Sequence, residues 1–178
     1  MATPAATIAY YTVIHSDQTG WTGGLLSLTR GGRPIEFQCT LPVRPSRAHQ
    51  ILFGATLRDH LLSEVIGPTL LKKMRTRIDL LVCDQPESLQ LVQRIDVPVA
   101  LVVEAAEADE GPIDDDALDG WTPIPLAGGT LRVPPEREER CQELAIDFRD
   151  LPDLVEPFDR IRSAIREAHG GVANRRAA

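Results

Sequence analysis

The chain has 178 residues, of which 43% are hydrophobic and only 4% are aromatic. This length suits one domain with an appended element, whose core must be built mainly from aliphatic side chains. The formal net charge of −7 argues against broad, non-specific binding to nucleic acid, because such binding needs a positive surface. Two local basic segments, residues 44–58 and 72–77, leave nucleic acid open as a partner, although the net charge does not favour it.

The cysteines and the N-terminus predict where the protein resides. Cys39, Cys83 and Cys141 are far apart and lack the spacing of metal ligands. An odd number of cysteines without a disulfide framework favours a reducing compartment. The N-terminus lacks the basic and apolar regions of a signal peptide, and no apolar run approaches membrane-spanning length. These features predict a cytoplasmic protein without a membrane partner.

The first forty residues predict three strands. Residues 7–15 (TIAYYTVIH) are rich in β-branched and aromatic types, and residues 24–30 form a second β-like run. The short link GGR leads into a third run at 34–40, where apolar and polar residues alternate. Because so short a glycine link closes a hairpin, the second and third strands are expected to be antiparallel.

The middle of the chain predicts a broken helical segment followed by a β-α-β unit. Glycines interrupt the helical spacing of residues 51–74. Residues 77–84 (RIDLLVCD) and 97–104 (VPVALVVE) are short apolar runs, typical of buried strands, and a short helix is predicted between them at 86–94. A crossover of this kind makes the two strands parallel neighbours.

The last third of the chain is more varied. Residues 105–120 (AAEADEGPIDDDALDG) are acidic and lack apolar periodicity, which predicts a solvated loop insertion. The segment that follows contains prolines and predicts a short edge hairpin, after which helical spacing resumes at Glu136. We therefore expect one α/β domain over residues 1–150, an amphipathic C-terminal helix over 151–170 and a flexible tail over 171–178.

The predicted C-terminal helix has an apolar stripe and a basic opposite face. The stripe includes Phe158, Ile161 and Ile165, and the basic face includes Arg162 and Arg166. Such a helix packs either on its own domain or on a second subunit, and its own domain is the favoured partner.

The order of the elements predicts a mixed five-stranded sheet flanked by helices, in which an antiparallel three-strand meander precedes the β-α-β unit. Three motifs accompany this order: SDQTGWTGGLLSLTRGGRPIEFQCT, IDLLVCDQPES and PPEREERCQELA. Together they resemble the ribonuclease H-like superfamily, with its acidic residue on the first strand, its aspartate at the end of the fourth strand and its carboxylate on the last helix. The resemblance covers about residues 7–145, with a large insertion between 104 and 134.

The resemblance implies phosphodiester hydrolysis by two magnesium or manganese ions, which requires several convergent carboxylates. It assigns Asp17 and Asp84 as metal ligands and catalytic residues. The glutamate expected on the first helix falls near His49 or Gln50, neither of which is anionic.

The position on the last helix also departs from the family pattern. It is occupied by Gln142, and Glu139 and Glu143 lie within one helical turn of it as possible substitutes. Two carboxylates instead of four predict weak affinity for magnesium.

Three functions follow from this incomplete set of acids. The favoured expectation is a non-catalytic interaction or accessory protein, without a cofactor, that binds a protein partner or forms a homo-oligomer. The alternative is a magnesium- or manganese-dependent nuclease or nucleotidyl-transfer enzyme that uses Asp17, Asp84 and either Glu139 or Glu143. A small-molecule-binding α/β domain, with its site at a strand end, is the third expectation.

Each candidate also has a purely structural interpretation. Asp17 is a common type of turn-opening residue, and Asp84 is well placed to cap a helix that begins at Pro86. We favour these structural roles for both aspartates, although the end of a parallel strand is where α/β sites gather. Trp21 and Trp121 either mark a partner surface or pack over a sheet edge, and packing is favoured.

Overall fold

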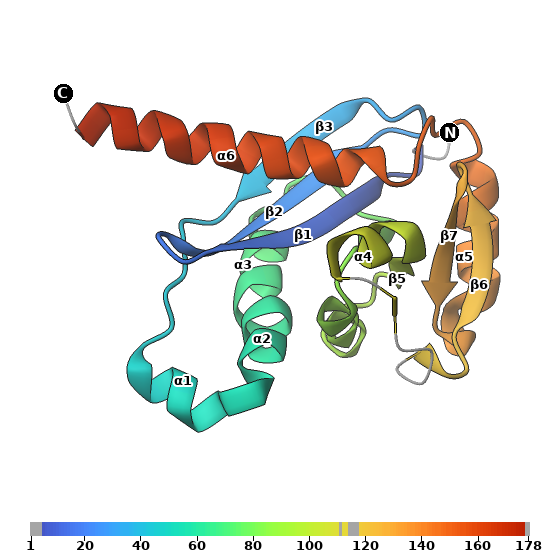
Figure 1. Ribbon diagram of the computed structural model, residues 1–178. Helices are drawn as coiled ribbons and strands as arrows, with labels where there is room; N and C mark the ends of the chain where they lie inside the picture. The colour runs from blue at the N-terminus through green and yellow to red at the C-terminus, as the bar shows by residue number, and fades with distance from the viewer. Residues whose placement is uncertain (1–4, 111, 114–117, 177–178) are drawn as a thin grey trace.

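The protein forms one mixed sheet with helices on both faces (Figure 1). The computed structural model describes residues 5–110, 112–113 and 118–176. The strand order across the sheet is β3-β2-β1-β4-β5-β7-β6. The strands are β1 (Ile8–Ser16), β2 (Gly20–Leu28), β3 (Pro34–Cys39), β4 (Leu80–Cys83), β5 (Val99–Val102), β6 (Thr122–Leu126) and β7 (Gly129–Val133).

Two sets of helices cover the sheet. The helix α6 lies across β1 and β2 on one face, and the helical segment from α2 to α3 lies on the opposite face (Figure 1). The α-helices are α1 (Arg47–Phe53), α2 (Leu57–His60), α3 (Gly67–Lys73), α4 (Val103–Glu110), α5 (Glu138–Asp147) and α6 (Glu156–Arg176). The described part of the chain also contains the 3-10 helices η1 (Gly54–Thr56), η3 (Pro86–Gln93) and η5 (Pro135–Arg137) and the π-helix η2 (Leu61–Ile66).

The meander and the β-α-β unit are confirmed, but the predicted number of five strands is too low. The strand β1 pairs with β2 in antiparallel fashion and with β4 in parallel, and β4 pairs in parallel with β5. The edge hairpin extends this sheet to seven strands because β7 pairs with β5. Pro123 and Pro125 lie on β6, at the sheet edge, where a missing N–H removes no ladder bond.

Alternation along the central strands builds two hydrophobic layers. In β1, Ile8 and Tyr10 pack in the layer beneath α6, whereas Ala9, Tyr11 and Val13 pack in the layer beneath η2 and α3. The same alternation in β4 places Leu80 and Val82 in the first layer and Leu81 and Cys83 in the second. The residue that follows a strand continues this alternation. The alternation therefore decides toward which face of the sheet its side chain points.

The C-terminal helix docks on its own domain, as favoured from the sequence. Phe158, Ile161 and Ile165 are fully buried against the sheet. The Phe158 ring meets the Tyr10 ring edge to face, with ring centroids 5.1 Å apart. Aromatic and branched side chains therefore fix α6 along the sheet.

A pair of glycines in β2 allows helices to approach both faces closely. A Cβ atom at Gly23 would lie 2.2 Å from Cγ2 of Ile66 in η2. A Cβ atom at Gly24 would lie 2.3 Å from Cγ2 of Ile161 in α6. Because these distances are far below van der Waals contact, both positions require glycine in the observed packing.

Two predicted boundaries differ from the structure. The predicted acidic loop at 105–120 includes most of α4, which continues to Glu110, while residues 111 and 114–117 lie outside the described part. The predicted tail at 171–178 is helical as far as Arg176, and residues 177–178 also lie outside it. None of the helices within the described ranges combines the length and apolarity needed to cross a membrane.

Candidate functional site

Asp84 lies at the carboxyl end of β4, near the centre of the sheet, and is fully buried. Its Oδ2 atom accepts a hydrogen bond of 2.9 Å from the Thr12 hydroxyl of β1. The same oxygen forms an ion pair with the guanidinium of Arg162, which α6 carries over this face of the sheet. A buried carboxylate requires such compensation, so β1, β4 and α6 are joined at this point by charge as well as by packing.

The register of the sheet places Thr12, rather than Asp17, beside Asp84. Tyr11 pairs with Cys83 in the parallel ladder, so the next residue of each strand is Thr12 and Asp84. Asp17 is exposed and lies in the turn after β1, five residues farther on, which is about 16 Å along an extended strand. The structure therefore does not bring the two aspartates together.

The two candidate glutamates lie on α5, at another part of the sheet. This helix contacts β6 at the sheet edge, whereas Asp84 follows the central strand β4 (Figure 1). Glu143 forms an ion pair of 3.0 Å with Arg140, and Glu139 is exposed on the same helix. Neither glutamate is brought to Asp84.

The remaining positions implied by the resemblance provide no further acid. Gln142 donates to Glu138 on its own helix. His49 and Gln50 belong to α1, a helix that has no buried residue. Within the described ranges, no group of three or more histidine, cysteine, aspartate or glutamate residues is close enough to hold a metal ion. The side chains around Asp84, a threonine and an arginine, do not form the carboxylate set that two magnesium ions need.

Asp84 does not cap the following helix, so that structural interpretation is wrong. Gln85 occupies the N-cap position of η3, and its side chain makes no capping bond. Instead, Oε1 of Gln85 accepts from the Val13 amide at 3.0 Å, and Nε2 donates to the Val13 carbonyl at 2.8 Å. The side-chain amide of Gln85 thus continues the pairing with β1 beyond the end of β4. The Asp84 side chain points toward α6, where it pairs with Arg162.

A groove opens at the carboxyl ends of β1 and β4, next to Asp84. Its first cavity, of about 310 Å³, is lined by Val13, Ile14, His15, Trp21, Arg58, Gln85, Arg162 and Arg166. Its second cavity, of about 420 Å³, is lined by His15, Ser16, Asp17, Gly20, Trp21, Arg44, Pro45, Gln50 and Leu57. His15 and Trp21 line both cavities, and we call the two cavities together the arginine groove.

The four arginines of the groove come from three separate segments. Arg162 and Arg166 lie one turn apart on α6, Arg58 belongs to α2 on the opposite side of the sheet, and Arg44 lies between β3 and α1. Each is held differently. Arg58 pairs with Glu87 at 2.9 Å, while Arg44 donates to the carbonyls of Gln18 and Thr19.

Arg44 and Arg166 are the more available charges. Arg44 is exposed, and the oxygens to which it donates are neutral carbonyls. Arg166 is exposed and forms no ion pair with any residue in the described ranges. Both guanidinium groups can therefore receive an anion without giving up a carboxylate.

A larger depression of about 510 Å³ lies elsewhere, beside β3, and has a structural explanation. The Glu36 carboxylate there accepts hydrogen bonds from the Gln38 side chain, from the Thr76 amide and hydroxyl and from the Arg75 amide. These hydrogen bonds stabilise the carboxylate and lower the pKa of Glu36 to about 2, and the bond from Gln38 makes the largest contribution. Glu36 thus joins β3 to the segment before β4.

Solved structures that align over most of the chain include two of endonucleases. Endonuclease V of Ciona intestinalis, in complex with a 24mer DNA containing an inosine followed by a ribo-adenosine, is similar to it with a TM-score of 0.44. The alignment has 9% identity and covers 95% of this chain and 88% of that one. Human ENDOV is similar with a TM-score of 0.41 and 16% identity, over 94% of this chain and 89% of that one. No family model and no curated protein matches the sequence.

This finding corrects one expectation. The expectation of a non-catalytic interaction or accessory protein is not upheld: the two structures named above are of endonucleases, which is the class that the nuclease alternative gave. It gives no support to the expected protein partner or homo-oligomer. At these identities the likeness concerns the fold and assigns no role to any residue of the groove.

Proposed function

We propose that the protein binds a nucleic-acid strand in the arginine groove, as part of a nucleic-acid-processing function. The observation that carries this proposal is the convergence of four guanidinium groups around one aromatic pair, at the strand ends beside Asp84. Guanidinium groups bind phosphate oxygens with two parallel hydrogen bonds, and aromatic rings stack on bases. The groove combines both kinds of contact.

The acidic net charge is compatible with this site because the positive charges are local. Arg44 and Arg58 belong to the basic segment visible in the sequence, and α6 adds Arg162 and Arg166 from the other end of the chain. Outside the groove the chain is net negative, which disfavours a bound strand there except at the basic segment 72–77. We therefore expect binding to weaken steeply as the salt concentration rises.

Arg166→Gln is expected to weaken binding to a fluorescein-labelled oligonucleotide in a titration followed by polarisation. Removing one phosphate contact lowers the slope of log K against log salt concentration by about 0.7 to 0.9, and the affinity by about threefold to tenfold at low salt. Arg166 is exposed, so the fold is retained. Arg149→Gln, an equally exposed change that follows α5, is the matched control and should leave both quantities unchanged. Equal affinity and equal slope for the two variants would refute the proposal.

A nuclease activity is the second candidate, favoured by the position of Asp84. This carboxylate follows a central parallel strand and pairs with Arg162, which lines the groove. Asp84 itself has no exposed surface, so its contact with a phosphate requires this ion pair to open. Within the described ranges, the protein's own side chains do not complete a two-metal site.

Cleavage of an oligonucleotide with magnesium or manganese, followed on a denaturing gel, tests this candidate. Asp84→Asn should abolish the cleavage, since the carboxylate is lost while the hydrogen bond from Thr12 can be kept. A binding titration of the same variant shows whether the loss of the ion pair with Arg162 also weakens binding. Glu139→Gln, on α5, is the control and should cleave as the wild type does. Undiminished cleavage by Asp84→Asn, or no cleavage by the wild type, would rule the candidate out.

A further inference from the structure

We infer that the arginine groove takes a single-stranded nucleic acid, with one base stacked on the ring of Trp21. This inference rests on the proposed function, and it adds the class of nucleic acid and the residue that selects it. Four features carry it: the position of Trp21, the ring beside it, the charges on either side and the concavity of the site.

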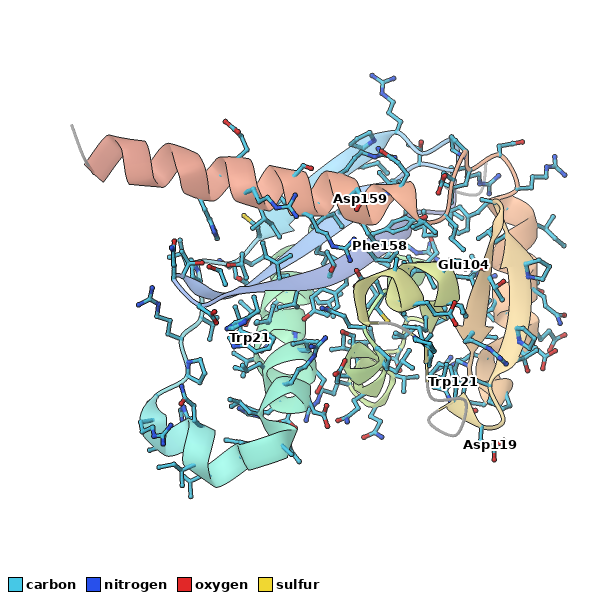
Figure 2. The ribbon with its side chains drawn as sticks, viewed as in Figure 1. Trp21, Glu104, Asp119, Trp121, Phe158 and Asp159 are labelled. Carbon is cyan, nitrogen blue, oxygen red and sulfur yellow. The ribbon has the colours of Figure 1, made fainter. Side chains whose placement is uncertain are left out.

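The backbone fixes the position of Trp21. Its amide donates to the Val43 carbonyl at 2.9 Å, and its carbonyl accepts from the Val43 amide at 2.7 Å. This bridge ties the start of β2 to the connector that carries Arg44. Figure 2 shows Trp21 at the end of the sheet close to the β1–β2 turn, well away from Trp121. The backbone that carries the indole is ordered before a ligand arrives, so little backbone entropy is lost on binding.

The Trp21 ring is already part of a stack. Its centroid lies 4.4 Å from that of the His15 imidazole, with the ring planes 35° apart. The side chain is only partly buried and borders both cavities of the groove. A base entering either cavity can extend this stack, and stacking is available to every base because all have a π face.

The charges lie on both sides of the stack. Arg44 lines the cavity on one side of Trp21, and Arg58, Arg162 and Arg166 line the cavity on the other. A strand that crosses the tryptophan can therefore place one phosphate in each cavity and the base between them on the indole. This alternation of phosphate, base and phosphate is the repeat of a nucleic-acid strand.

The concavity of the groove selects an unpaired strand. Inside a duplex both faces of each base are covered by neighbouring base pairs, and a protein meets only the backbone and the base edges in the grooves. A ring that borders two recessed cavities is reached by a base that has left the stack. Volumes of about 310 and 420 Å³ are those of small-ligand sites and not of a surface that cradles a duplex.

Affinities for two nucleic acids test the inference. The wild type should bind a labelled single-stranded oligonucleotide at least about tenfold more tightly than the same sequence as a blunt duplex. Trp21→Leu should lose about tenfold in single-strand affinity, and Trp21→Phe should retain most of it because a ring remains. Trp121→Leu, the other tryptophan in the sequence, is the matched control and should bind as the wild type does.

Tryptophan fluorescence provides a second readout that does not depend on affinity. The chain has two tryptophans, so in Trp121→Phe the emission comes from Trp21 alone. Saturating Trp121→Phe with the single-stranded oligonucleotide should quench this emission strongly. Saturating Trp21→Phe with the same oligonucleotide should quench the remaining Trp121 emission only a little. Because Trp21 is unchanged in Trp121→Phe, the quenching still tests stacking even if Trp21→Leu loses affinity through altered folding.

The outcomes separate this inference from the proposed function. If neither single strand nor duplex binds, the proposed function fails and the inference with it. If binding depends on Arg166 but Trp21→Leu binds normally, or if Trp21 is not quenched, the inference alone is overturned. Equal affinity for duplex and single strand, with Arg166 dependence retained, also overturns the inference alone.

Discussion

Arg162→Met is expected to lower the free energy of unfolding by about 3 kcal/mol, because it removes the cationic partner of a buried carboxylate. Asp84 has no exposed surface, and its ion pair with Arg162 offsets the cost of its dehydration. Methionine retains the apolar stem of the arginine, so the loss reports the charge rather than the packing. Urea unfolding followed by circular dichroism measures it.

A double variant separates charge from shape. In Asp84→Asn/Arg162→Met the buried group is neutral, so the double variant should be more stable than Arg162→Met alone by at least about 1 kcal/mol. Arg166→Met, on the same side of α6 but exposed, should change stability by less than about 0.5 kcal/mol. If Arg162→Met and Arg166→Met are equally mild, the ion pair makes no contribution to stability.

Local patterns were sufficient to predict most of the elements. Alternation and β-branched residues predicted β1 and β3, and apolar runs between polar residues predicted β4 and β5. The number of strands was wrong because the pairing of β7 with β5 depends on the register of Leu101 with Arg132, which no local pattern encodes. An edge hairpin that stays separate from the main sheet would have the same sequence pattern as one that pairs with β5.

The candidate site was harder to predict, for the same reason. The resemblance assigned the first carboxylate to Asp17, the acidic residue nearest the first strand. The residue beside Asp84 is instead set by the parallel register of β1 with β4, which brings Thr12 to a partner 72 positions away. Alternation along β4 could have placed Asp84 on the same face as Val82, beneath the terminal helix.

The arginines of the groove were visible separately but not together. The segment 44–58 and the polar face of the terminal helix both appeared basic in the sequence. Their convergence at His15 and Trp21 depends on α2 and α6 lying on opposite faces of one sheet (Figure 1). A sequence gives the charge of each segment, whereas the sheet decides which segments share an end.

Gly24→Ala is expected to lower the free energy of unfolding by about 1–3 kcal/mol, although alanine normally improves a strand. The added Cβ would lie 2.3 Å from Cγ2 of Ile161 and 3.0 Å from Cδ1 of Ile165, both fully buried, so α6 has to shift. Gly31→Ala is the control, since a Cβ there meets nothing within 4 Å. Chemical unfolding of the two variants gives the comparison.

The same substitution should also affect the groove, because Gly24 pairs with Thr12 directly beneath α6. A glycine at this point lets α6 approach the sheet closely enough for Arg162 to reach Asp84. The same close approach determines how far Arg166 lies from the strand ends. Ile161→Leu removes the branch methyl that Gly24→Ala meets, so the double variant should regain both stability and oligonucleotide affinity relative to Gly24→Ala. If stability returns and affinity does not, the position of α6 is not what aligns the arginines of the groove.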